Sequence, residues 1–362
     1  QGHRSIRGTM NNLSLMISSG APKRTGGPDL PGGYGAIVGQ AQWAEEHGFK
    51  GVWVGEGRLV TNAIVPITLI ASNTKRIKVG SGILPYRTRN AALMAVTWKT
   101  LDDLAPGRMR LGLGGWWEPL ATRCGLPNRK PLKAMREVIT VTKGMLAGGL
   151  VTYHGEFVDV EDVKFDGPTD DDDHSYPVPI FIGAVRMGMC RLSGEIADGV
   201  LLDFLVPPSY TSLAMEAIRE GAAKSGRSLD DFEVPQLIAA SANDDDPQAA
   251  IDDCKAFLTQ YLAQQPHISE FSGADEELLA KIKSILGWPA TKAEITEAMK
   301  LVPNELTQHV AACGTTTDVL DKIAEWVDHG CTEPVITPLG DDPFSTLNSI
   351  AKKANLPKTG AG

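Results

Sequence analysis

The sequence lacks closely spaced cysteine pairs, long apolar runs and a surplus of basic residues. Its five cysteines are scattered along 362 residues without a CxxC pair, which predicts reduced thiols and a cytoplasmic location. No segment approaches the roughly 18 apolar residues of a membrane span. Asp and Glu number 44 against 35 Lys and Arg, giving a formal net charge of −9. This balance argues against a nucleic-acid-binding surface and leaves small molecules as the expected partners.

Several motifs of common catalytic and binding sites are also missing. No GxGxxG follows the first expected strand, and the segment Gly112 to Trp117 has a tryptophan where a dinucleotide fold needs its third glycine. GxxxxGK[ST] and GxSxG do not occur. His and Cys do not pair at ligand spacing, so we expect no metal site.

The most informative stretch is residues 77–117. A β-branched run ending at Ser81-Gly82-Ile83 precedes a helix expected over about 90–104, and a second strand is expected over about 109–113. This is a βαβ unit, whose strands are parallel and whose active groups are expected at their C-terminal ends. Gly114-Gly115 followed by Trp116 and Trp117 suits a flat aromatic ligand, although a glycine turn with core tryptophans remains open.

Strands and helices alternate along the whole chain. Eight short apolar segments, most followed by a helical pattern, predict an α/β protein with a (β/α)8 TIM barrel and insertions. Residues 1–10 are interpreted as a tag or disordered segment, and residues 11–362 as a single domain. Insertions are expected at about 151–175, where the pattern alternates like a hairpin, and at about 265–310, where short helices are expected to cover the barrel mouth and set substrate choice.

Three groups of residues lie at expected strand ends. Glu56 follows the second strand, where it could bind a cofactor ring or move a proton, or instead cap a helix or form a structural ion pair with Arg58. Gly82-Ile83 is followed by Arg87 and Arg89, which could hold an anionic substrate or simply lie on the surface. The run Gly183-Ala184-Val185-Arg186 precedes a helix, whose N-terminal amides are suited to a phosphate.

Five stretches together resemble one family. AEEHGFKGVWVGEG, TLDDLAPGRMRLGLGGWW, VTYHGEF, PIFIGAVRMGMCRLSGEIADG and AEWVDHGCTEPVITPLGDD are similar, in this order, to the luciferase-like family of flavin and deazaflavin barrels. The segment Gly80 to Ala92, the insertion after Gln265 and ELTQHVAACGTTTDV resemble its coenzyme F420-dependent branch. The resemblance implies an F420-dependent oxidoreductase and a homodimer. FMN is the alternative cofactor of a monooxygenase on the same barrel, and a non-catalytic flavin-binding barrel is the third reading.

The resemblance also implies roles for particular residues. A non-proline cis peptide at Gly82-Ile83, or at Ser81-Gly82, would support the deazaflavin ring. Gly183 to Arg186 would hold the phosphate, and Gly114, Gly115 and Trp116 would lie beside the ring. The family's histidine after the second strand is replaced here by Gly57. This leaves Glu56 or Glu118 as the expected proton donor, with Arg87, Arg89 and Trp117 toward the substrate.

Overall fold

The structure is a computed structural model that describes residues 12–17, 33–57, 59, 61–166 and 175–356. The expected tag at residues 1–10 and Arg58 therefore lie outside the described residues. The described chain separates into two compact units, which are taken one at a time. The first unit contains residues 14–201 and 216–233, and the second contains residues 12–13, 202–215 and 234–356. The expectation of one barrel domain stays a prediction.

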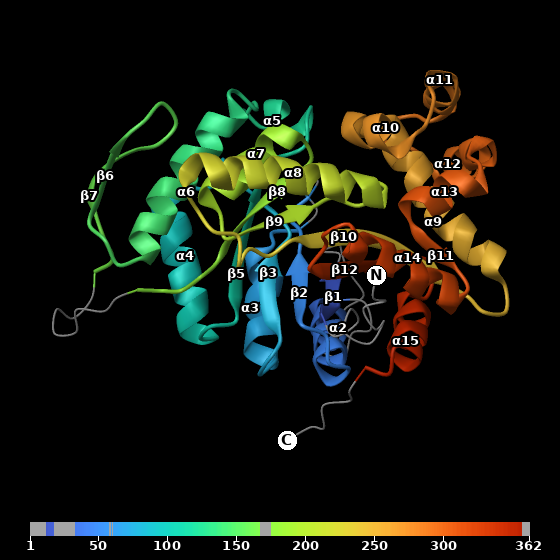
Figure 1. The fold of residues 1–362 in the computed structure, drawn as a ribbon, viewed down its shortest axis with the longest axis horizontal. Coiled ribbons are helices and arrows are strands. Elements are labelled where there is room, and N and C mark those ends of the chain that lie inside the picture. The colour runs from blue at the N-terminus through green and yellow to red at the C-terminus, as the bar shows by residue number, and fades with distance from the viewer. Residues whose placement is uncertain (1–11, 18–32, 58, 60, 167–174, 357–362) are drawn as a thin grey trace. The chain divides into compact units, whose positions relative to one another are not determined.

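The first unit is built on a parallel sheet (Figure 1). Its strands follow one another in the order β1 (Ser14–Ile17), β2 (Gly51–Val54), β3 (Lys78–Ser81), β5 (Met109–Gly114), β8 (Ile180–Ala184) and β9 (Gly199–Leu202). The two-residue strand β4 (Leu84–Pro85) pairs with the end of β5. The helices of this unit are α2 (Tyr34–Glu46), α3 (Ile64–Asn73), α4 (Ala91–Leu104), α5 (Leu120–Arg123), α6 (Pro131–Leu146) and α7 (Met187–Ile196).

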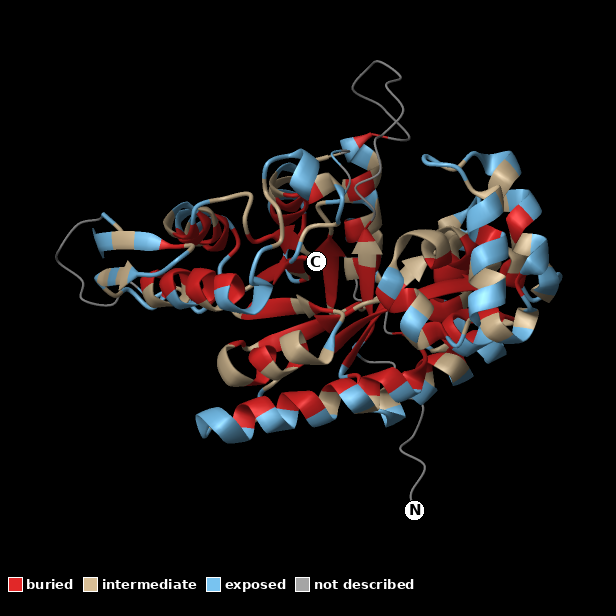
Figure 2. Ribbon diagram, turned by 90° about the horizontal axis from the view of Figure 1, so that it is seen from above, coloured by how far each residue is buried: buried red, intermediate tan, exposed pale blue. Residues whose placement is uncertain are grey.

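The strands of the first unit are buried along nearly their whole length, as expected for a parallel sheet with both faces covered (Figure 2). The register brings Trp53 beside Gly80, and Gly80 beside Arg110. Trp53 covers Gly80, because a Cβ there would lie 2.7 Å from the indole. The buried guanidinium of Arg110 lies 5.3 Å from the Trp53 ring and 3.7 Å from the Glu233 carboxylate. This charge is therefore compensated inside the unit.

Helix α4 illustrates how the sequence fixes the helices. The Asn90 side chain caps the helix by accepting hydrogen bonds from the backbone N–H groups of Ala92 and Leu93. Met94, Trp98 and Leu101 recur at helical spacing and are buried against the sheet. The helix ends before Pro106-Gly107, where Gly107 has a φ of 66°. The predicted strand–helix–strand unit is confirmed.

A hairpin leaves the first unit after α6. Strands β6 (Val151–His154) and β7 (Asp159–Val163) pair antiparallel, which confirms the predicted hairpin. Its turn is attached to α6 by the buried carboxylate of Glu137, which accepts hydrogen bonds from the N–H groups of Glu156, Phe157 and Val158 at 3.1, 2.6 and 3.0 Å. Burial alone would raise the pKa of Glu137, but these N–H donors hold it below its usual range.

In the second unit, β10 (Pro235–Ala242) pairs in parallel with β11 (Ala312–Gly314) and β12 (Glu333–Pro338). Gln236 of β10 also pairs with Leu202, the last residue of β9. The flanking helices are α8 (Pro208–Ser225), which continues into the first unit, α9 (Pro247–Gln264), α14 (Thr316–Asp328) and α15 (Pro343–Lys353). The predicted short helices of the insertion are α10 (Pro266–Ser272), α11 (Glu276–Ile285), α12 (Lys292–Ala298), η2 (Met299–Leu301) and α13 (Asn304–Val310).

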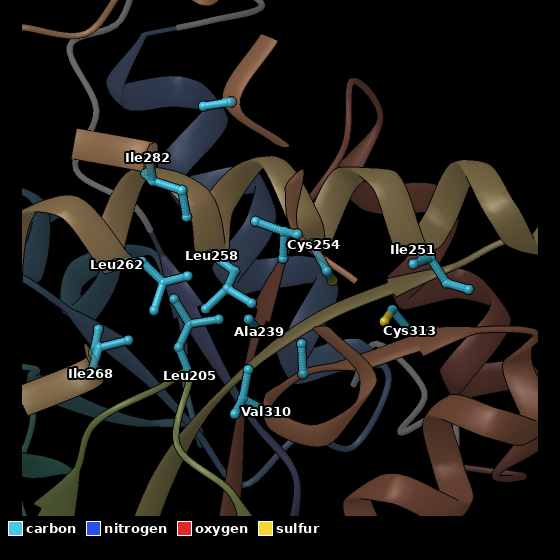
Figure 3. Packing of buried hydrophobic residues seen from close by; sticks show 13 residues of the cluster. Leu205, Ala239, Ile251, Cys254, Leu258, Leu262, Ile268, Ile282, Val310 and Cys313 are labelled. Atoms are coloured by element: carbon cyan, nitrogen blue, oxygen red, sulfur yellow. The ribbon is translucent and has the colours of Figure 1, made fainter. Parts of the chain in front are cut away.

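The insertion is packed rather than loosely attached. An apolar cluster joins Leu258 and Leu262 of α9 to Ile268 of α10 and Ile282 of α11, and Leu205 completes it from the segment after β9 (Figure 3). All five side chains are almost completely removed from solvent. Burial on this scale fixes the insertion to α9 and to the segment after β9 within the second unit.

Candidate active site at the strand ends of the first unit

The candidate site centres on the segment that follows β3. The Gly82–Ile83 peptide bond is cis, which confirms the more favoured of the two expected positions. Backbone hydrogen bonds fix this segment between its neighbours: Gly82 N–H donates to Val54 at 2.8 Å, and Glu56 N–H donates to Ile83 at 3.0 Å. On the other side, the Ser81 hydroxyl accepts from Gly112 N–H at 2.9 Å. The segment is thus attached to the C-terminal ends of β2 and β5.

Glycines on the adjoining strands make room for the Ile83 side chain. A Cβ on Gly114 would lie 2.6 Å from Ile83 Cγ1, and one on Gly183 would lie 2.6 Å from Ile83 Cγ2. A Cβ on Gly112 would lie only 2.0 Å from the Ser81 carbonyl oxygen. Since carbon atoms normally approach to about 3.5–4.0 Å, larger residues at these positions would displace the segment. The strand-end glycines therefore have a specific steric role, and Ile83 remains half-buried.

Glu56 lies beside the cis bond and is paired. Its two carboxylate oxygens accept hydrogen bonds from the Arg89 guanidinium at 3.0 and 2.9 Å, and Oε2 also accepts from Ala63 N–H at 2.9 Å. The ion pair with Arg58 that the sequence suggests lies outside the described residues; among those described, Glu56 pairs with Arg89. The pair joins the loop after β2 to the start of α4, and it engages an arginine expected to face the substrate.

The loop after β5 carries the tryptophans. Trp116 donates from Nε1 to the Gly57 carbonyl at 3.2 Å, and its own carbonyl accepts from the Asn128 side chain at 2.9 Å. Trp116 is therefore held across the loops that follow β2 and β5. Trp117 is half-buried next to it, and Gly115 is exposed. Both indoles therefore lie in the loop after β5, and their contact with a flat ligand stays a prediction.

Glu118 is exposed and shapes the same loop. Its carboxylate accepts from the N–H groups of Asn128 and Thr122 at 3.0 and 3.1 Å. The hydrogen bond from the Asn128 N–H has the largest effect and lowers the pKa of Glu118; burial opposes it, and Thr122 lowers the pKa further. The ionised form is thus favoured, which suits a loop-stabilising carboxylate better than a general acid. Its catalytic role stays a prediction.

The predicted phosphate segment connects β8 to α7. Gly183 and Ala184 end the strand, Val185 follows, and Arg186 is the N-cap residue with extended backbone. The Arg186 side chain makes no capping hydrogen bond to the first turn of α7. N-terminal amides of a helix without a side-chain cap are suited to an anion.

Sequence reasoning missed one polar pair, which lies in the second unit. His267 Nε2 of α10 is 2.8 Å from Oδ2 of Asp203, and Asp203 directly follows β9. The signal was available, because Asp203 follows its strand as closely as Glu56 follows β2. Its partner is 64 residues away, inside the insertion, so only the fold reveals the pair.

The sequence also predicts no metal site and no membrane-spanning segment. Within the described residues, no three His, Cys, Asp or Glu side chains gather in a way that could hold a metal ion. Over the same part of the chain, the helices are too short or too polar to cross a membrane.

Comparisons with known proteins agree with this geometry. Residues 14–333 match the family model for luciferase-like monooxygenases. The 5,10-methylenetetrahydromethanopterin reductase of Archaeoglobus fulgidus is 30% identical over 319 residues, which cover 87% of this chain and 93% of that protein. The F420-dependent glucose-6-phosphate dehydrogenase of Kineococcus radiotolerans is 25% identical over 336 residues, which cover 88% and 91%.

Solved structures give the same result for the fold. The coenzyme F420-dependent tetrahydromethanopterin reductase from Methanopyrus kandleri superposes with a TM-score of 0.80 at 26% identity, covering 94% of this chain and 97% of that one. An F420-dependent secondary alcohol dehydrogenase, solved with an F420-acetone adduct, superposes with a TM-score of 0.73 at 18% identity, covering 94% and 97%. The predicted (β/α)8 barrel fold, with its insertions, is confirmed.

Proposed function

The chain belongs to the luciferase-like monooxygenase family, and on this premise we propose that it is a coenzyme F420-dependent oxidoreductase. The reaction proposed is hydride transfer between the deazaflavin and an imine-like, carbonyl or activated alkene carbon of a small organic substrate. Two observations support this function together: the glycine-lined cis segment at the strand ends, and the similarity to 5,10-methylenetetrahydromethanopterin reductases over most of the chain. A pterin-bound one-carbon unit is the substrate class that this similarity favours.

The residues fit the cofactor. The Ile83 side chain fills the space left by Gly114 and Gly183 and is only half-buried, so it offers a flat ring a surface at the strand ends, and Trp116 offers an aromatic surface in the neighbouring loop. Ser81, Gly82 and Ile83 would support the ring, and Gly114 and Gly115 would border it. Gly183, Ala184, Val185 and Arg186 would hold the phosphate at the start of α7.

When bound, F420 supplies a ring carbon that donates or accepts a hydride in a two-electron step. The chain orients the reactants, excludes water and holds a proton where one is needed. Glu56 and Glu118 are the two carboxyl groups proposed for that proton. Glu56 is favoured by its position, because its N–H is bonded to Ile83, whereas Glu118 lies on an exposed loop. To carry a proton, the Glu56 carboxyl group must first separate from the Arg89 guanidinium. Trp117, Arg87 and Arg89 are proposed toward the substrate side.

An FMN-dependent monooxygenase is the alternative function. FMN also has a phosphate and a tricyclic ring, so the strand-end glycines and the start of α7 suit both cofactors. The two are distinguished by titrating the purified protein with F420 and separately with FMN, following fluorescence quenching. Micromolar or tighter binding of F420 alone is expected. Tight binding of FMN with weak binding of F420 would refute the proposed function, and binding of both without turnover would favour a non-catalytic barrel.

The proposed enzyme is a homodimer in the cytoplasm. The outer face of α4 exposes Leu93, Val96 and Leu104, and neighbouring α3 exposes Val65. An apolar surface on two adjacent helices is suited to a second copy of the chain. The five free cysteines support a reducing compartment. Light scattering should give the dimer mass, and Leu93→Lys should lower it to that of the monomer. A monomeric parent protein would refute the dimer.

A further inference from the structure

The Asp203–His267 pair lies in the second unit and has no part in the reaction as proposed so far. Asp203 directly follows β9, and His267 is the second residue of α10 in the insertion. His267 Nε2 is 2.8 Å from Oδ2 of Asp203, and His267 is only 9% exposed. In a (β/α)8 barrel, the groups that act on a substrate follow the C-terminal ends of the strands. The position of Asp203 is therefore typical of a residue that serves substrate binding.

Hydrogen bonds fix the orientation of Asp203. Its Oδ1 accepts from the Phe204 N–H at 2.9 Å, while Oδ2 faces His267. The Asp203 carbonyl accepts from the Gln236 side-chain amide at 2.7 Å, and Gln236 in turn accepts from the Thr211 hydroxyl at 2.7 Å. This network holds Asp203 in one orientation, with one carboxylate oxygen directed at the histidine.

Apolar packing holds the two backbone segments together without help from this pair. Leu205, two residues after Asp203, and Ile268, directly after His267, belong to one cluster and are 1% and 0% exposed. Figure 3 shows both side chains near Leu262 of α9. Since this cluster already fixes the insertion, the polar pair is not needed for that purpose. A pair held in a pre-formed frame also loses little freedom when a ligand binds.

The pairing determines which nitrogen of His267 carries the proton. An ionised carboxylate only accepts hydrogen bonds, so Nε2 of the neutral imidazole carries its proton toward Asp203. The other nitrogen, Nδ1, then has a lone pair and is a hydrogen-bond acceptor. Nδ1 has no hydrogen-bond partner among the described residues. It is also not one of the fully enclosed polar atoms in that part of the chain, so a ligand can reach it.

Aromatic side chains adjoin the Asp203–His267 pair. The Phe204 ring packs against those of Phe257 and Tyr261 of α9, with ring centres 5.1 and 5.0 Å apart. All three residues are half-buried, so part of their aromatic surface stays exposed. Because the Phe204 N–H is bonded to Asp203, this surface begins directly beside the carboxylate. An aromatic surface next to a nitrogen acceptor suits a flat heterocycle that carries N–H groups.

We propose that His267 accepts a hydrogen bond through Nδ1 from an N–H group of the substrate, and that Asp203 is the positioning residue that sets its tautomer. This inference rests on the proposed function, because it assigns a substrate contact to the same enzyme. The substrate class is a flat nitrogen heterocycle with N–H donors, such as a reduced pterin. An ionised phosphate or carboxylate lacks such a donor and meets the negative charge of Asp203, so the pair discriminates against anionic groups.

The experiment titrates the protein, saturated with F420, with 6-methyltetrahydropterin by anaerobic calorimetry. His267→Phe removes the acceptor and should lower the affinity about tenfold, as for the loss of one hydrogen bond. Asp203→Asn is the sharper variant. Its amide oxygen must accept from the Phe204 N–H, so its NH2 group faces Nε2 of His267 and donates to it. Nδ1 then carries the proton, and the affinity should again fall about tenfold although the two side chains stay bonded. His329→Phe, at the exposed end of α14, is the control and should leave the affinity unchanged.

Denaturant unfolding of the same variants separates substrate binding from a structural role. A loss of stability with unchanged affinity for the pterin would make the pair structural and overturn the inference. The nearly isosteric Asp203→Asn is expected to fold even if His267→Phe does not. Absence of pterin binding to the parent protein, with F420 bound, would overturn the inference and leave the proposed function standing. Absence of F420 binding would overturn the proposed function, whereas the pterin titrated alone would still support or overturn the hydrogen bond to His267.

Discussion

The steric match between Gly183 and Ile83 gives the sharpest prediction. In Gly183→Ala the new methyl group would lie 2.6 Å from Ile83 Cγ2, about 1 Å inside normal contact. Overpacking of this kind costs about 1–3 kcal/mol, and we expect about 2 kcal/mol here because the opposing atom belongs to a backbone-anchored segment. Ile83→Ala, at a half-buried position, should cost about 1–2 kcal/mol.

The double variant Gly183→Ala with Ile83→Ala tests whether the contact between the two side chains causes the loss of stability. Ile83→Ala removes both γ carbons and leaves Cβ at 3.6 Å from the new methyl group, an ordinary contact. The combined loss in free energy of unfolding should therefore be smaller than the sum of the single losses by about 1–2 kcal/mol. Denaturant unfolding followed by circular dichroism measures all four proteins. Gly39→Ala, in α2 with open space around the glycine, is the control and should stabilise slightly. Additivity within about 0.5 kcal/mol would refute the steric reasoning.

Three further predictions concern charged groups. Glu56→Gln should lower turnover at least 100-fold while cofactor affinity is retained. Glu118→Gln should change turnover less than tenfold. If steady-state assays show the larger loss for Glu118→Gln, the proton is assigned to Glu118. Because the pKa of Glu137 is lowered in the folded state, its stabilising effect is present above the usual glutamate range and is lost as pH falls below it. The protection factors of the hairpin-turn amides, which correct for the intrinsic pH dependence of hydrogen exchange, should fall when the pH drops below that range, and Glu137→Gln should abolish this fall. Arg110→Ala should cost about 1–3 kcal/mol in denaturant unfolding, because it removes a buried guanidinium packed beside Trp53 while Glu233 keeps its pair with Lys50, and a loss below about 0.5 kcal/mol would contradict that role.

Local signals in the sequence were sufficient for most elements. Helices α6 and α9 begin at Pro131 and Pro247, because proline at the first helical position has its φ already set. The short elements β4, β11 and α5 were missed, since two to four residues carry too little periodicity to be recognised. The cis bond was located through the family resemblance and could not have been derived from Gly82 and Ile83 alone.

The candidate site was predicted less completely than the fold. Its glycines and tryptophans were found because strand ends can be read from sequence. The contact partners of these residues were not found, because they depend on long-range geometry: Glu56 meets Arg89, 33 residues away. The pairing of Asp203 with His267 was also invisible, since it needs α10 at the end of β9. Spacing along the chain indicates which residues reach a strand end, but only packing decides what they contact.

The Glu56–Arg89 pair has a consequence for how a ligand enters. The segment from Gly82 to Arg89 is anchored at its start by the backbone of β2 and at its end by this ion pair. A surface held at both ends has little conformational freedom left to lose when a ring settles on it. Association should then proceed in one fast kinetic phase, and differences in affinity between ligands should appear mainly in the dissociation rate. Removing the ion pair with Arg89→Met would add a slow phase to stopped-flow traces, because the segment would have to become ordered after the ligand binds.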